Sequence, residues 1–168
     1  MRGILLAAAL SVAAAALAEE KNLAPDPSFQ EGEKTWLGYV IENPSTWTFN
    51  AAQGGEPASV TLTGGRTFLH SSRFAVTAGK TYRIAFKAKG DGKVSPGLLW
   101  WKPEFGMAEP HWTRPEQPLA AEAAWKDFTV EFPASPESTE VYVRFEVTAG
   151  SATISSVSVV EVPAPAGG

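Results

Sequence analysis

The stretch GLLWWKPEFGMAEPHWTRPE, residues 97–116, holds the side chains of this sequence best suited to binding a ligand. Three of the six tryptophans, Trp100, Trp101 and Trp112, lie here among prolines, glycines and charged residues. An indole ring offers a flat apolar surface at a low cost in conformational entropy, and a sugar ring has an apolar C–H face with a rim of hydroxyls. Tryptophans beside polar side chains therefore indicate sugar binding by ring stacking.

Strand alternation separates the two adjacent tryptophans. If residues 94–101 form a strand, neighbouring side chains point to opposite faces of the sheet. One face carries Val94, Leu98 and Trp100, and the other carries Ser95, Gly97, Leu99 and Trp101. The first set predicts a core position for Trp100. The second leaves a shallow floor around Trp101 and predicts a binding face, unless Pro96 marks a bulge that shifts the alternation.

A long polar and aromatic loop follows the predicted strand. Loops on a rigid sheet are where binding residues usually lie, so we expect Trp112 to form a wall of a ligand groove. Glu104, His111 and Arg114 would line its rim. The alternative is that Trp112 folds back and covers an edge of the sheet, as satellite clusters under long loops do.

The sequence lacks the residue patterns of catalysis, so we expect no enzyme activity. It has no cysteine and no G-x-S-x-G stretch to present a serine nucleophile. His70 and His111 are far apart and have no metal-ligand spacing around them, and His70 is expected at a surface or a strand end. Glu104 and Glu109 could supply the two carboxyl groups that a glycosidase needs, but a loop does not hold two carboxyl groups at a fixed separation.

The N-terminus predicts export. Arg2, an apolar run from Ile4 to Leu17 and a small-residue ALA site at 16–18 have the layout of a secretory signal peptide, residues 1–18. A retained anchor helix is the alternative, but the run is short for a membrane span. We therefore expect a secreted or periplasmic monomer with no membrane insertion after cleavage. The basic residues are scattered in a chain of net charge −4, which argues against a nucleic-acid partner.

Period-two alternation dominates the mature chain and predicts an all-β fold. The clearest strands are expected at 82–89, 127–132 and 140–147, with further candidates at 57–64, 70–76 and 151–162. Residues 118–125 are expected to form a loop with room for one helical turn, and Gly90-Asp91-Gly92 a hairpin turn. About nine short strands in residues 19–162 predict a two-sheet antiparallel β-sandwich. Residues 163–168 are expected to be a disordered tail.

The order of several segments resembles a known family. NLAPDPSFQEG leads to a Trp, RFAVTAGKTYRIAFKAKGDG follows, and AAWKDFTVEFPA and VYVRFEVTAGSATISSVSVV come last. This order is similar to that of the carbohydrate-binding modules of the jelly-roll, galactose-binding-like type that are attached to xylanases, the group of families 4, 9, 16 and 22. The resemblance implies a jelly-roll sandwich and a glycan or polysaccharide partner. It also implies packing roles for Trp36 and Trp125, while alternation favours a core position for Trp47.

The resemblance also implies a structural calcium, which this sequence supports weakly. Many members of the family hold the ion with carboxylates where this chain has Phe29-Gln30 and Ser155-Ser156. Asp26 and Glu31 are near enough to compensate in part, but the charged ligands that calcium prefers are fewer. We therefore expect no cofactor and no metal.

Two functions remain open from the sequence. The first is a secreted, non-catalytic protein that holds a glycan by aromatic stacking on a sheet face and the adjoining loop. The second is a structural or protein-interaction β-sandwich of the cell envelope that binds no sugar, since tryptophan and arginine are also favoured in protein interfaces.

Overall fold

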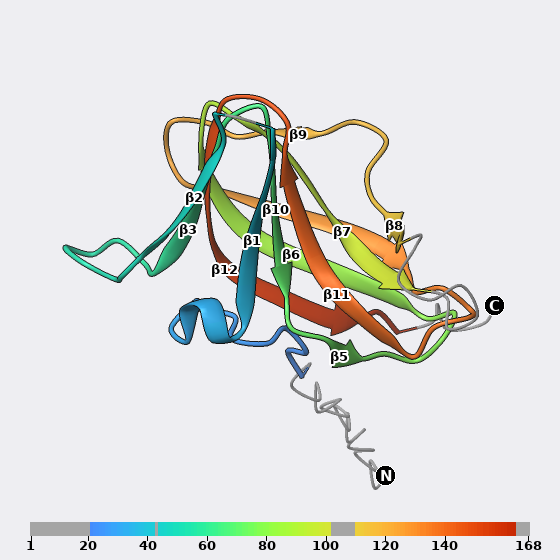
Figure 1. Cartoon of the computed structure of the whole chain (residues 1–168). Helices are drawn as coiled ribbons and strands as arrows, with labels where there is room; N and C mark the ends of the chain where they lie inside the picture. Colours follow the sequence, from blue (N-terminus) through green and yellow to red (C-terminus); the bar gives the residue numbers. More distant parts are fainter. Residues whose placement is uncertain (1–20, 43, 102–109, 164–168) are drawn as a thin grey trace, which may run out of the picture.

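Two antiparallel sheets pack face to face in the computed structural model, which describes residues 21–42, 44–101 and 110–163 but not the side chains at 101 and 110 (Figure 1). The first sheet contains β1 (Trp36–Glu42), β4 (Arg66–Ser71), β11 (Glu140–Val147), β7 (Lys93–Trp101) and β8 (Pro110–Thr113) in this order, with β5 (Phe74–Ala75) beside β11 and β9 (Leu119–Ala120) beside β7. The second contains β10 (Lys126–Pro133), β6 (Thr81–Gly90), β12 (Ser151–Glu161), β3 (Ser59–Thr63) and β2 (Thr46–Asn50). A 3-10 turn, η1 (Gly32–Lys34), precedes β1. The predicted all-β, two-sheet sandwich is confirmed.

The core lies between the sheets and is built by the alternation seen in the sequence. On β6, Tyr82, Ile84, Phe86 and Ala88 are buried. On β11, Val141, Val143, Phe145 and Val147 are buried and face them across the sandwich. Because a strand turns alternate side chains to opposite faces, the remaining residues of β11 lie on the outer face of the first sheet.

A bulge in β12 keeps its apolar residues in the core. The pairing with β6 shifts between Ser155 and Ser158, and Ser156 has a positive φ of 55°. Ile154 is buried before the bulge, and Val157 and Val159 are buried after it. Ile154 and Val157 are three positions apart, so in a regular strand their side chains would point to opposite faces. The extra residue in the bulge lets both side chains point into the core.

Three sequence predictions about local structure need correction. Residues 70–76 do not form one strand, because β4 ends at Ser71 and β5 is a separate pair of residues. Residues 118–125 contain no helical turn; they form a loop in which Leu119 and Ala120 make up β9. Residues 90–92 are not a hairpin turn, because β6 and β7 belong to different sheets and this turn carries the chain between them. The Asp91 carboxylate accepts a hydrogen bond from the Ser151 backbone N–H at 2.8 Å and ties this turn to the one before β12.

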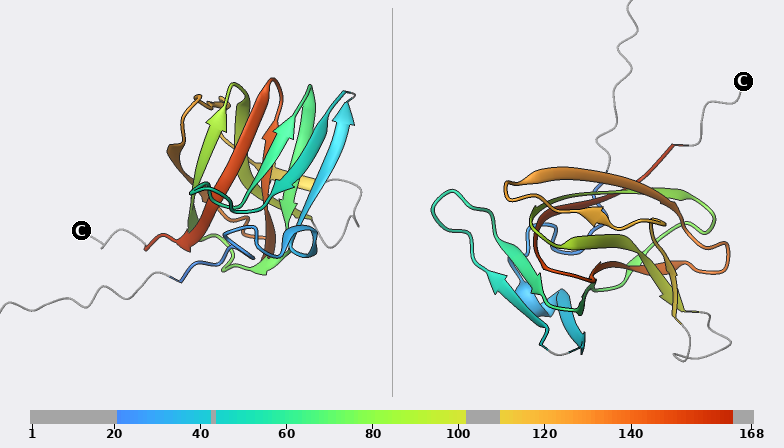
Figure 2. Two further views of the ribbon diagram at one scale, coloured as in Figure 1. Left: turned by 90° about the vertical axis from the view of Figure 1, so that its left-hand side faces the viewer. Right: turned by 90° about the horizontal axis from the view of Figure 1, so that it is seen from above.

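The second sheet faces the viewer in the left view of Figure 2, where β6, β12, β3 and β2 run side by side. The predicted signal peptide, residues 1–18, and residues 164–168 of the predicted tail lie outside the described residues. Within the described part of the chain, no helix is long and apolar enough to span a membrane.

Candidate functional site

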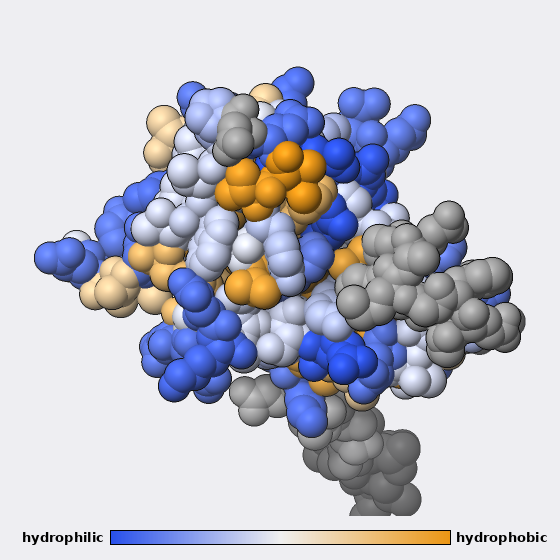
Figure 3. Space-filling model, viewed as in Figure 1, coloured by the Kyte–Doolittle hydropathy of each residue, from blue (hydrophilic) through white to orange (hydrophobic). Residues whose placement is uncertain are grey.

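A groove of about 560 Å³ lies on the outer face of the first sheet. It is lined by Leu37, Tyr39 and Ile41 from β1, Phe68 and His70 from β4, and Tyr142 and Arg144 from β11, together with backbone and side chains of residues 33–36 and 71–72. Figure 3 shows this face of the molecule, where apolar areas alternate with polar ones. The lining thus combines aromatic surface with a few polar groups, as ligand sites generally do.

Strand β1 supplies one wall of the groove. Trp36 is fully buried, and its indole N–H donates to the backbone carbonyls of Pro25 and Asp26 at 3.0 Å each. With Trp36 fixed in the core, alternation turns Leu37, Tyr39 and Ile41 outward. The Tyr39 side chain is 43% exposed, which leaves an aromatic surface open to solvent at the wall of the groove.

His70 lies in the middle of the lining, beside rings from three strands. Its imidazole is 5.1 Å from the Tyr39 ring, 6.2 Å from Phe68 and 6.4 Å from Tyr142, measured between ring centroids. The Nε2 atom is buried and has no hydrogen-bond partner in the described part of the chain. Burial, and then repulsion by Arg144, lower the pKa of His70 to about 4. The imidazole is therefore neutral at pH 7, and its buried Nε2 makes no hydrogen bond to the described residues.

Arg144 lies next to His70 in the cross-strand register and is 8% exposed. Its guanidinium rests on two aromatic rings, 3.4 Å from the centroid of Phe68 and 4.2 Å from that of Trp112. Its Nε is buried without a hydrogen-bond partner. Burial lowers the pKa of Arg144 to about 10, although attraction by Glu146 opposes the shift. The side chain stays charged at neutral pH.

Trp112 reaches this face because Gly97 has no side chain. Trp112 on β8 pairs with Leu99, and the indole lies over Gly97, where an added Cβ would overlap the indole nitrogen and the Thr113 carbonyl oxygen. The ring is half-buried and meets Phe68 edge-on, with centroids 6.3 Å apart. Its Nε1 is a second buried donor without a partner in the described residues.

Two further arginines share one buried carboxylate beside the groove. The Glu146 side chain is 1% exposed and accepts from Arg66 Nε at 2.7 Å and from Arg114 Nη1 at 2.9 Å. The Arg114 guanidinium also lies 4.6 Å from the centroid of the Trp112 ring. Arg66, Arg114 and Arg144 are called the arginine cluster below.

The structure places the predicted site residues in three groups. Trp112 and Arg114 lie together at the end of the groove face, as described above. His111, on the neighbouring position of β8, stacks on Trp100 with centroids 4.5 Å apart, and Trp100 belongs to the core as predicted. Trp101 ends β7, but its side chain and the whole of Glu104 lie outside the described residues.

Sequence reasoning missed the residues at the centre of the groove. His70 was expected at a surface or a strand end rather than as a ligand; it is indeed one residue from the end of β4 on the outer face, but it lies in the groove between two other strands. The residues that could have revealed the groove in the sequence are those at the outward-facing positions of each alternating strand. In EVYVRFEV the apolar positions predict the core, and the positions between them, Tyr142, Arg144 and Glu146, are those that line or border the groove.

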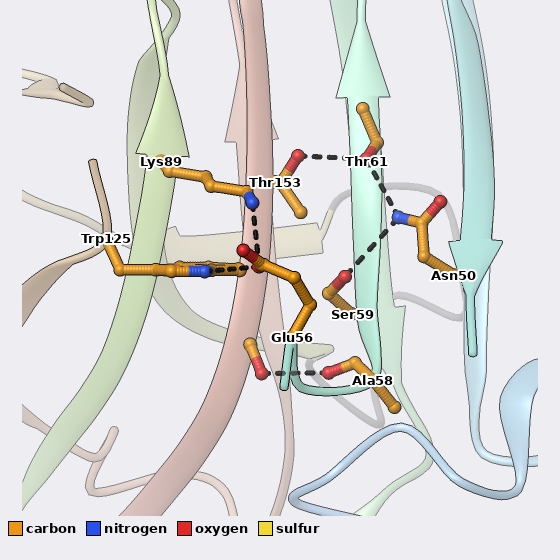
Figure 4. Close-up of polar contacts among 9 residues, drawn as sticks. Asn50, Glu56, Ala58, Ser59, Thr61, Lys89, Trp125 and Thr153 are labelled. Carbon is orange, nitrogen blue, oxygen red and sulfur yellow. Dashed lines mark hydrogen bonds and ion pairs between the residues drawn. The ribbon is translucent and has the colours of Figure 1, made fainter. Parts of the chain in front are cut away.

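The expected core position of Trp125 is wrong. Its side chain is half-buried on the outer face of the second sheet (Figure 4). The indole N–H donates to Glu56 Oε2 at 2.6 Å, and Lys89 Nζ lies 4.7 Å from the ring centroid and 2.7 Å from the same oxygen. Trp125 therefore holds the loop between β2 and β3 against the sheet. Trp47 does pack against the core, over Gly38, as predicted.

The residues at the family's calcium position do not fit a calcium ion. Asp26 uses its carboxylate oxygens to accept from the backbone N–H groups of Gln30 at 2.9 Å and Glu31 at 2.7 Å. Ser155 donates to the Ala58 carbonyl. Within the described residues no group of three or more acidic, histidine or cysteine side chains gathers as a metal site would require.

Neither a protein-family model nor a curated protein matches the sequence. Solved structures do match. The enzymatically active domain of bacteriophage CBA120 tailspike protein 4 superposes with a TM-score of 0.63 at 13% identity, over 84% of this chain but 21% of the tailspike chain.

Two binding modules match over nearly their whole length. TmCBM61, solved with β-1,4-galactotriose, gives a TM-score of 0.53 at 16% identity over 84% of this chain and 99% of the module. The CBM22-1 xylan-binding domain of Paenibacillus barcinonensis Xyn10C gives 0.58 at 12% identity over 82% of this chain and 92% of the domain. The chain therefore has the β-sandwich fold of the carbohydrate-binding modules of families 4, 16, 22 and 61.

Proposed function

We propose that this protein is an exported, non-catalytic glycan-binding protein whose ligand lies in the groove on the outer face of the first sheet. The observation that carries the proposal is the combination, in one groove, of an open aromatic side chain with unpartnered polar groups. Tyr39 is exposed, and His70 Nε2 and Arg144 Nε have no hydrogen-bond partner in the described residues.

Each of these groups has a role in the proposal. A pyranose ring would lie against Tyr39, with Trp112 bounding the site at its other end. The neutral imidazole of His70 and the guanidiniums of Arg144 and Arg114 would bond to hydroxyls on the sugar rim. Trp101, Glu104 and His111, which the sequence also predicted at the site, remain predictions. The neighbours that bind galactotriose and xylan support a glycan as the ligand.

The absence of catalysis is proposed on the same grounds. A glycosidase needs two carboxyl groups on either side of the bond that it breaks. The groove as described contains Glu33 at one end, and Glu146 beside it is held by two arginines. Export is proposed from the predicted signal peptide, and N-terminal sequencing of the secreted protein tests it.

Affinity electrophoresis on gels containing soluble xylan, galactan or β-glucan tests the binding. We expect at least one glycan to retard the protein, and Tyr39→Ala and Trp112→Ala to remove the retardation. Trp125→Ala is the matched control, because Trp125 is also half-buried beside a cation but lies on the opposite face. Circular dichroism melting curves show whether each variant is folded.

Two results would contradict the proposal. One is retardation by no glycan in the panel. The other is retardation that Trp125→Ala removes and Tyr39→Ala does not, which would place the site on the second sheet. A stable protein partner captured by crosslinking, together with no glycan binding, would favour an interaction module of the cell envelope.

A further inference from the structure

We propose that the glycan bound in this groove carries negative charges, as carboxylates or sulfate esters, and that Arg144 with the rest of the arginine cluster binds them. The inference rests on the proposed function, because it names the class of glycan that the same groove binds. It starts from the charge on this face. The whole chain has a net charge of −4, yet one arginine, Arg144, lines the groove and two more lie beside it.

The charges around the groove do not balance. Three guanidiniums belong to the arginine cluster, and the carboxylate that pairs with them is that of Glu146. Glu42 lies opposite Arg66 in the pairing of β1 with β4, so one positive charge is left over among the described residues. His70 adds none at neutral pH because burial lowers its pKa to about 4. Glu33 and Lys34, which line the end of the groove at η1, are of opposite sign and offset each other.

Arg144 is the residue whose charge is least compensated. Arg66 and Arg114 take the two oxygens of Glu146, which attracts Arg144 but is already paired with the other two arginines. The buried Nε of Arg144 has no hydrogen-bond partner in the described part of the chain. Its contacts are the ring faces of Phe68 and Trp112. Leaving a buried charge without a partner is costly, so the site gains most from a ligand that brings the missing anion.

The planar guanidinium of Arg144 suits an oxyanion. A guanidinium presents its donors in a planar fork that matches two oxygens of a carboxylate or a sulfate, and such charge-assisted bonds are stronger than bonds to hydroxyls. Because Phe68 and Trp112 lie against Arg144, the fork is held in place and is partly shielded from water. An anionic sugar can therefore lie against Tyr39 while its charged group meets Arg144.

Pairs of glycans that differ only in charge test the inference. The binding constants of glucuronoxylan and its carboxyl-reduced form, and of polygalacturonate and its methyl-esterified form, would be measured by affinity electrophoresis or calorimetry. A sulfated xylan separates sulfate from carboxylate as the charged group. We expect the charged member of a pair to bind at least roughly tenfold more tightly, from the usual strength of charged hydrogen bonds. The difference should shrink as sodium chloride is raised.

Three variants locate the effect. Arg144→Gln keeps a donor but removes the charge, and it should abolish the preference for the charged glycan. Arg114→Gln changes an exposed, ion-paired arginine and should reduce the preference for the charged glycan. This variant provides the test if Arg144→Gln does not fold. Arg83→Gln is the matched control, because Arg83 is an exposed arginine paired with Glu131 at 2.9 Å on the second sheet. It removes the same charge and should leave the preference unchanged.

The outcomes separate this inference from the proposed function. Equal binding of charged and neutral glycans would overturn the charge inference and leave glycan binding standing. A preference that Arg83→Gln lowers as much as Arg114→Gln does would also overturn it, since the effect would then come from net charge alone. Binding to no glycan, charged or neutral, would contradict the proposed function itself.

Discussion

Replacing His70 by glutamine should change how the stability of the protein depends on pH. The pKa of His70 is lowered to about 4 in the folded protein, because the imidazole is buried and lies next to Arg144. In the unfolded chain its pKa is about 6.5. Between these two values the unfolded state binds a proton that the folded state does not, so folding becomes less favourable as the pH falls.

The size of this effect follows from the two pKa values. At pH 7.5 both states are neutral and His70 contributes almost nothing to the pH dependence. At pH 5 the unfolded state is protonated and the folded state is not, which costs about 2 kcal/mol of unfolding free energy. The loss approaches about 3 kcal/mol at pH 4, where the folded state begins to take up the proton. His70→Gln cannot lose this stability, because it has no imidazole.

Urea unfolding at pH 7.5 and pH 5 measures the effect on the wild-type protein and the variant. Between the two pH values the wild type should lose about 2 kcal/mol more than His70→Gln, a difference that urea titrations resolve. An NMR titration of the His70 imidazole checks the cause directly. If the difference between the two proteins is the same at both pH values, or if His70 titrates with a midpoint above pH 6, the argument from burial and Arg144 is wrong.

Two further predictions concern the packing behind and over the groove. Trp36→Ala should lower the unfolding free energy by about 3–5 kcal/mol in urea, because it removes a fully buried ring, whereas Trp36→Phe should cost less, since a ring still packs on Phe145. Gly97→Val should cost at least about 1–3 kcal/mol and weaken glycan retardation on gels, because its Cβ would overlap both the Thr113 carbonyl oxygen and the indole of Trp112, so that β8 and Trp112 must move. Unchanged retardation by folded Gly97→Val would show that the position of Trp112 does not matter for binding.

The sequence by itself was enough to predict the fold class. Alternation is a local property, because successive side chains of a strand point to opposite faces whatever the strand pairs with. It correctly predicted the strands around 82–89 and 140–147 and the core position of Trp100. The family resemblance failed for Trp125, because a large apolar residue at a strand end can have the core or a surface group such as Glu56 as its partner.

Only the tertiary structure could show the groove. Its residues come from β1, β4 and β11, which lie far apart in the sequence and become neighbours through sheet pairing. Local patterns carry no information about which strands pair or in what register. The register places His70 beside Arg144 and Tyr39 beside Phe68, and so determines which rings are open and which charge is left without a partner. Alternation therefore determined which side chains face outward, and pairing between distant strands determined which of them form a site.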